Sequence, residues 1–179
     1  MSNVKYILRI ALMLLLITSV MAAALAAVNQ FTEPMIAAYQ AEKTQKAIEM
    51  VLPGGGEEIS FTDASGMVST VYASETGYAV EVNPVGFDGA ITMMVGIDTQ
   101  GNVLGIRVIS HTETAGLGAV AAADSAKGEA FRNQFLGLVN GIVVDGEENS
   151  IDSMSGATIT SKAVTAGVNA ALDFVANLG

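Results

Sequence analysis

The N-terminal part of the chain is dominated by one long apolar run. Ile10–Phe31 contains no charged residue, and Ile10–Val28 is almost unbroken in its apolar character. A helix needs about 20 such residues to cross the hydrocarbon core of a bilayer, so the run predicts a membrane anchor. A cleaved signal peptide is the alternative, because Ala24-Leu25-Ala26 fits a cleavage site behind a basic start. The apolar core of a signal peptide is usually only about 7–15 residues long, however.

A second helical pattern follows this run. Thr32, Glu33 and Pro34 can open a helix as an N-cap, an acidic first-turn residue and an early proline. Met35–Val51 then has apolar and charged residues at helical spacing, and the anchor can also continue into this segment as one stalk. Leu52–Gly56, which holds a proline and three glycines, predicts a firm end to the helix.

Beyond this linker the pattern changes to short β-rich runs separated by turn residues. The expected strands are Met67–Ala73, Tyr78–Val82, Ala90–Ile97 and Val103–Ile109. Asp98–Asn102 predicts a hairpin connection between the last two. Because the runs and their connections are short, we expect the strands to pair antiparallel.

Helical patterns return in the C-terminal part. We expect a helix over about Ala121–Phe135, a short strand around Ile142–Val144, and a clear amphipathic helix over Thr160–Leu178. Helices on one side of an antiparallel sheet define an α+β fold. The predicted organisation is a cytoplasmic start and transmembrane anchor (1–31), a helical stalk and Gly-rich linker (32–56), and an extracytoplasmic domain (57–179).

Charge is distributed unevenly along the chain. The formal net charge is −10, and all 18 acidic residues lie at or beyond Glu33, whereas Lys5 and Arg9 precede the apolar run. Basic residues mark the cytoplasmic side of a membrane helix. We therefore expect a single-pass protein of the cell (inner) membrane with a cytoplasmic N-terminus. The acidic domain would repel phosphate backbones, which argues against nucleic acid as a partner.

Composition also narrows the chemistry. The chain has no cysteine, which excludes disulfides, thiolate nucleophiles and iron–sulfur clusters. With His111 as the single histidine we expect no metal site, and the paired acids Glu57-Glu58 and Glu147-Glu148 fit solvated turns better than acid–base catalysis. No catalytic side chain is therefore predicted, and redox chemistry would need a bound organic cofactor.

The segment Ser155–Ser161 stands where the last helix should begin. A helix N-terminus offers unpaired N–H groups and a partial positive charge, which suits a phosphate. Gly156 permits close approach of the backbone, Thr158 and Thr160 supply hydroxyls, and Lys162 adds a cation. Without other information, a simpler interpretation is that one of the two threonines is an ordinary N-cap.

Two blocks resemble one known family. Asp152-x-x-Ser155-Gly156-Ala157-Thr158 is similar to the sequence that a flavin transferase recognises in FMN-binding subunits of Rnf and Na⁺-translocating NADH:quinone reductase complexes. That resemblance implies FMN esterified through its phosphate to Thr158. His111–Gly118 resembles the His-x-Glu-Thr-Pro-Gly-Leu-Gly loop of the Rnf G subunit and departs from it at Ala115, where a proline is usual.

Together the blocks imply one covalent FMN site. A tethered phosphate fixes one end of the cofactor, and the loop would supply a wall for the ring. Besides Thr158, the implied cofactor-binding residues are Ser155, Gly156, Ala157, Thr160, Ser161, Lys162, His111, Glu113, Thr114, Gly116, Leu117 and Gly118.

The resemblance implies a membrane-anchored electron-transfer subunit of an Rnf-type ferredoxin:NAD⁺ oxidoreductase that moves Na⁺ or H⁺, with no complete activity of its own. The implied partners are the other membrane and peripheral subunits, a flavin transferase and membrane lipid. Alternatives are the FMN subunit of a Na⁺-translocating NADH:quinone reductase or a stand-alone anchored FMN reductase. A pilin-like structural protein also has a long apolar helix before an α+β head, but no prepilin cleavage signature precedes the run.

Overall fold

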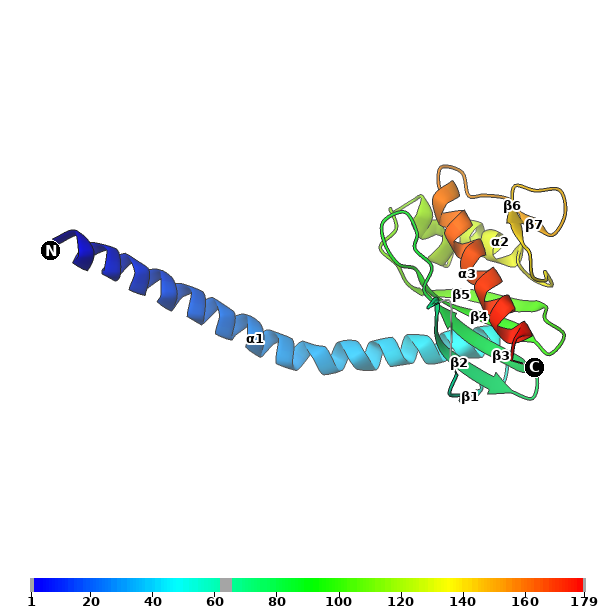
Figure 1. Cartoon of the computed structure of the whole chain (residues 1–179), viewed down its shortest axis with the longest axis horizontal. Helices are drawn as coiled ribbons and strands as arrows, with labels where there is room; N and C mark the ends of the chain where they lie inside the picture. Colours follow the sequence, from blue (N-terminus) through cyan, green and yellow to red (C-terminus); the bar gives the residue numbers. More distant parts are fainter. Residues whose placement is uncertain (1, 62–65, 179) are drawn as a thin grey trace. The chain divides into compact units, whose positions relative to one another are not determined.

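A computed structural model describes residues 2–61 and 66–178 of the chain. The chain forms two compact units, residues 1–42 and residues 43–179. The first helix, α1 (Ser2–Val51), makes up the first unit and contributes its last turns to the second (Figure 1).

Helix α1 is continuous where the sequence predicted a new helix to start. Thr32 is not an N-cap, because its hydroxyl donates to the carbonyl oxygen of Val28 at 2.8 Å, one turn earlier in the same helix. Pro34 lies inside the helix, where it removes a single backbone donor. The predicted helix start at Thr32 is therefore wrong, and the alternative of a continuous stalk is confirmed. Among the described residues, α1 is the one helix long and apolar enough to cross a membrane.

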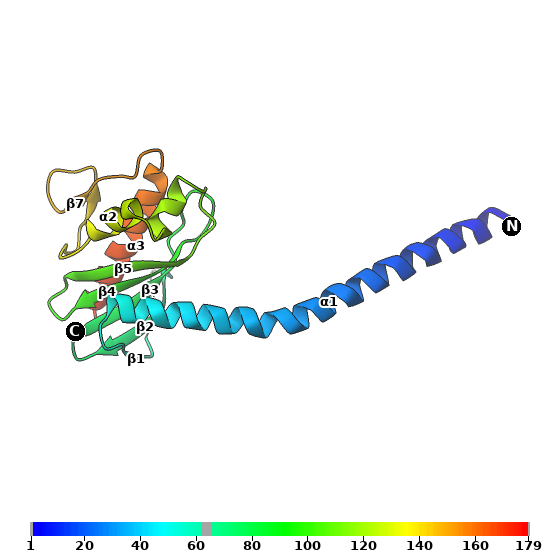
Figure 2. The ribbon, with the colours of Figure 1, turned by 180° about the vertical axis from the view of Figure 1, so that it is seen from behind.

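The second unit is built on a five-stranded antiparallel sheet in the order β1-β2-β3-β4-β5 (Figures 1 and 2). Its strands are β1 (Glu57–Glu58), β2 (Val68–Ser74), β3 (Gly77–Val82), β4 (Thr92–Asp98) and β5 (Val103–Ser110). The four predicted strands are confirmed, each to within two residues at either end. The predicted hairpin at Asp98 is also confirmed, since its carboxylate accepts from the backbone N–H groups of Gln100 and Asn102, both at 2.8 Å.

Both faces of this sheet are covered. Side chains alternate across β3 and β4, so that Ala79 and Met94 contact the end of α1 on one face. Val80 and Val95 belong to the larger cluster on the other face, which α3 (Thr158–Ala176) covers. The α+β class is confirmed, but the expectation that helices lie on one side only is wrong, because the last turns of the stalk close the second face.

The segment after β5 is more broken than the sequence predicted. In place of one helix over Ala121–Phe135 there is a 3₁₀ helix, η1 (Gly118–Ala122), and then α2 (Ala126–Asn133). The chain is extended at Ala123, and Ser125 caps α2 by accepting from the N–H of Gly128 at 3.3 Å. Strands β6 (Val143–Val144) and β7 (Ser150–Ile151) then pair in parallel.

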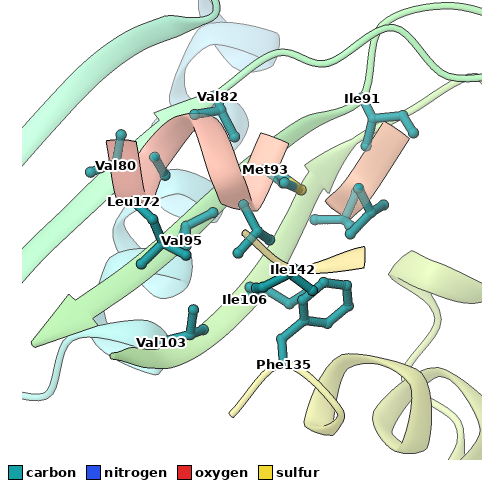
Figure 3. Close-up of a cluster of buried hydrophobic side chains, with 14 of the residues drawn as sticks. Val80, Val82, Ile91, Met93, Val95, Val103, Ile106, Phe135, Ile142 and Leu172 are labelled. Carbon is teal, nitrogen blue, oxygen red and sulfur yellow. The ribbon is translucent and has the colours of Figure 1, made fainter. Parts of the chain in front are cut away.

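The main core lies between the sheet and α3 (Figure 3). Val80, Met93 and Val95 of the sheet are fully buried, as are Val164 and Val168 of α3. Burial of such side chains contributes about 1.5–3 kcal/mol each. This packing fixes the start of α3, which carries one wall of the site described next.

Candidate functional site

A pocket lies between the start of α3 and the loop that follows β5. Its volume is about 350 Å³. It is lined by Phe87, Glu113, Thr114, Leu117, Gly118, Gly156, Ala157, Thr158, Ile159 and Thr160. Three segments that are far apart in the sequence thus meet at one site, and two of them are the blocks singled out above.

The start of α3 places a threonine and an uncapped helix end at this pocket. Thr158 is the first helical residue and is exposed, and the preceding Ala157 makes no side-chain capping bond. Gly156 has a φ of 74°, a left-handed conformation in which a side chain would be strained. The interpretation of Thr158 or Thr160 as an ordinary N-cap is therefore wrong. Backbone N–H groups in the first turn of such a helix can bind an anion.

Glu113 joins the three segments. Its side chain is only 7% exposed, and one carboxylate oxygen accepts from the backbone N–H groups of Phe87 at 2.8 Å and Asp88 at 3.1 Å. The other oxygen accepts a short hydrogen bond from the hydroxyl of Thr160. Gly118 leaves room for this contact, because a Cβ there would lie 2.5 Å from the Thr160 oxygen. The buried carboxylate is thus satisfied by three donors.

Hydrogen bonding keeps Glu113 ionised. Burial raises the pKa of its carboxyl group, but the hydrogen bonds from Thr160, Asp88 and Phe87, with His111 nearby, outweigh burial and leave the pKa below the ordinary 4.5. The unfolded chain therefore binds this proton more readily than the folded chain does. The stabilisation is fully present above about pH 4.5 and is lost as the pH falls through the lower, folded value.

We expect Glu113→Gln to make the free energy of unfolding less dependent on pH in the acidic range. Glutamine has nearly the same size but does not titrate, so the wild-type advantage in the free energy of unfolding should shrink as the pH falls below 4.5. Chemical denaturation of both proteins in detergent at a series of pH values measures this difference. Parallel stability curves for the two proteins would contradict the role given to this carboxylate.

The remaining residues predicted around Thr158 lie beside the pocket. Ser161 is fully buried, accepts from the N–H of Met154 at 2.9 Å and donates to the carbonyl oxygen of Ala157 at 3.0 Å, so it shapes the turn before α3. Ser155 and Gly116 are exposed loop residues, and Lys162 is exposed at the fifth position of α3. These last three do not line the pocket.

The structure places His111 elsewhere. It lines a different cavity, together with residues of β5 and of the last turns of α1. The pocket at Thr158 and this cavity share no lining residue. His111 and Glu113 belong to one block of the sequence and were predicted to line one site. In the structure, the two residues line different cavities.

Phe87 is a lining residue that the sequence did not reveal. Its ring is 66% exposed, yet its backbone is held by Glu113, and the hydroxyl of Thr112 donates to the carbonyl oxygen of Asp88 at 2.5 Å. Gly86 lets the turn approach closely, since a Cβ there would lie 2.8 Å from the side chain of Ile91. An aromatic residue in a turn flanked by glycines was the available signal.

The chain carries an FMN-binding domain, because residues 86–173 match the family of that description. The chain is 31% identical to the G subunit of the ion-translocating oxidoreductase complex of Methanosarcina acetivorans, over 98% of this chain and 97% of that protein. It is 31% identical to the G subunit of the Na⁺-translocating ferredoxin:NAD⁺ oxidoreductase complex of Acetobacterium woodii, over 97% and 94% of the two chains. It is 32% identical to the proton-translocating counterpart of Clostridium ljungdahlii, over 84% and 82%.

The chain therefore belongs to the family of G subunits of ion-translocating oxidoreductase complexes. The resemblance found in the two sequence blocks is confirmed by matches that extend over nearly the whole chain. The long apolar helix α1 accords with a single-pass membrane anchor.

Proposed function

We propose that this chain relays electrons in an ion-translocating ferredoxin:NAD⁺ oxidoreductase complex through FMN bound by a phosphoester to Thr158. One observation carries the proposal: an exposed threonine occupies the first position of an uncapped helix and lines a pocket of about 350 Å³. The names of the relatives from Acetobacterium woodii and Clostridium ljungdahlii supply the reaction.

The residues present suit FMN in size and chemistry. Sites for small ligands have volumes of about 300–1,000 Å³, and this pocket falls within that range. The helix N-terminus would hold the phosphate through its backbone N–H groups. Phe87, Leu117 and Ile159 offer apolar side chains to the ring, and Thr114 offers a polar contact at its edge. His111 is left out of this proposal because it lies along the other cavity.

Ester formation needs only one side chain of this protein. The new bond joins Oγ1 of Thr158 to phosphorus, the hydroxyl loses its proton, and a leaving group departs from phosphorus. A flavin transferase and its flavin donor would supply the remainder. When bound, FMN supplies one- and two-electron transfer. The protein holds the ring and excludes water from part of it, and covalent attachment prevents loss of the cofactor by dilution.

We also propose an orientation and an organisation for the chain. Residues 1–31 would form the cytoplasmic start and the transmembrane anchor, 32–56 the stalk and linker, and 57–179 the extracytoplasmic domain. Lys5 and Arg9 support a cytoplasmic N-terminus. The other membrane and peripheral subunits of the complex would then be the electron donor and acceptor.

Mass spectrometry of the attachment peptide tests the proposal. The chain is produced together with a flavin transferase, digested, and the peptide that contains Ser155–Ser161 is fragmented. We expect a mass gain equal to FMN less one water, located on Thr158, because the ester lacks the hydroxyl hydrogen of threonine and one phosphate hydroxyl group of free FMN. An unmodified peptide from protein made under these conditions would reject covalent attachment.

A further inference from the structure

The wall of the pocket at Thr158 carries a negative charge that the binding of a phosphate does not require. Ten of the residues that the structure describes line this pocket, and Glu113 is the charged one among them. The other nine are apolar residues, glycines and threonines. The lining side chains therefore give the wall a net charge of −1, located on one carboxylate.

Water has little access to this carboxylate. The side chain of Glu113 is buried, and a glycine packs against each of its oxygens. A Cβ at Gly86 would clash with one oxygen, and a Cβ at Gly118 would clash with the other. Charges interact more strongly where water and salt ions are excluded, because the effective dielectric constant is lower than in bulk water. The charge of Glu113 is therefore screened less than a surface charge would be.

The hydrogen bonds to Glu113 hold its charge in place without cancelling it. The donors are the backbone N–H groups of Phe87 and Asp88 and the hydroxyl group of Thr160, and all three are neutral. Such bonds favour the ionised form of a carboxyl group, in agreement with the lowered pKa of Glu113. The carboxylate is thus a fixed negative charge beside any molecule that occupies the pocket.

We propose that Glu113 lowers the midpoint potential of the flavin in this pocket through the negative charge of its carboxylate. The inference rests on FMN occupying the pocket at Thr158, as proposed above. Uptake of two electrons and one proton adds one negative charge to a flavin, and a fixed negative charge nearby opposes that change. The electrons come from the donor subunit and the proton from solvent, so Glu113 acts by its charge alone.

Potentiometric titration of the full-length flavoprotein in detergent tests this role. Glu113→Gln preserves the size of the side chain, and its amide oxygen can still accept from the two backbone N–H groups. We expect this variant to favour reduced flavin at least tenfold more than wild type does, which is a rise of about 30 mV for two electrons. The titration is made at pH 8, where histidine side chains are ordinarily neutral, so that His111 adds no charge.

Two further variants separate charge from structure. Glu148→Gln removes the same charge from an exposed residue between β6 and β7, so its potential should stay close to wild type. Thr160→Val removes the hydroxyl group that donates to Glu113 but leaves the carboxylate charged, so its potential should not rise. A purely structural role of Glu113 would raise both potentials, because Glu113→Gln and Thr160→Val disturb the same hydrogen bond.

A pair of variants at Thr114 tests the same wall without altering the buried hydrogen bonds of Glu113. Thr114 lines the pocket and is exposed, so a longer side chain there does not disturb the core. Thr114→Glu and Thr114→Gln differ in charge and hardly in size. We expect the lower potential in Thr114→Glu, and this comparison remains valid if Glu113→Gln fails to fold.

Three results would overturn the inference. One is an equal midpoint potential in wild type and Glu113→Gln. Another is an equal rise in Glu113→Gln and Thr160→Val. The third is an equal potential in the two Thr114 variants. In each of these cases flavin is bound, so the proposed function would stand while the role of Glu113 would fall. Wild-type protein that binds no flavin would instead overturn the proposed function, and this inference with it.

Discussion

Replacing Thr158 by alanine is expected to abolish covalent flavin completely, whereas Thr158→Ser should retain it. Alanine removes the hydroxyl oxygen that would form the ester, and serine keeps that oxygen at the same position of α3. Because Thr158 is exposed at the helix start, neither change disturbs the core. Fluorescence of the denatured protein in a gel, after production with a flavin transferase, measures the attachment directly.

Thr160→Ala is the matched control for this experiment. Thr160 is buried and donates to Glu113, so its loss should lower stability but leave the ester in place. Fluorescence that survives in Thr158→Ala and disappears in Thr160→Ala would place the attachment point at Thr160 instead. A colourless wild-type protein would end the proposal for both positions.

Gly96→Ala is expected to destabilise the domain by about 3 kcal/mol, since overpacking a well-filled site costs that much. Gly96 lies on β4 beneath the end of α1. A Cβ at this position would clash with the carbonyl oxygen of Val51 and lie 2.7 Å from its carbonyl carbon. These are backbone atoms, so a side-chain rotation cannot relieve the contact, and the helix end must move off the sheet.

Gly105→Ala offers a close comparison. Gly105 pairs directly with Gly96 across β4 and β5, but its Cβ would meet Val51 Cα at 3.7 Å, an ordinary contact. This variant should therefore be close to neutral in its free energy of unfolding. Urea denaturation of both proteins in detergent measures the difference, and equal stabilities would show that the helix end does not rest on Gly96.

Much of the fold was predictable because it follows local periodicity. Short apolar runs separated by turn residues predict β3 and β4 from the local sequence. The turn residues that follow Asp98 predict the hairpin in the same way. The break within Ala121–Phe135 was not predictable in this way. Asp124 pairs with Arg107 of β5, and Ser125 caps the start of α2. The position of the break therefore depends on a tertiary contact, which local periodicity does not reveal.

The site was predicted in its chemistry but only partly in its geometry. Two sequence blocks supplied Glu113 and Thr158, and the structure places both on one pocket. The contribution of Phe87 depends on Glu113 accepting from its backbone, a contact across 26 positions of the chain. His111 lies near Glu113 in sequence but lines another cavity, because neighbouring residues in an irregular loop need not share surroundings.

The burial of α3 has a consequence for anything bonded to its first residue. Val164, Val168 and Leu172 hold this helix against the sheet, so the backbone at Thr158 is immobilised by the same contacts that keep the domain folded. Freedom in an attached group can then come only from the single bonds beyond Cα. The range of positions open to such a group is then set by the length of its own chain, measured from a fixed anchor point on the domain.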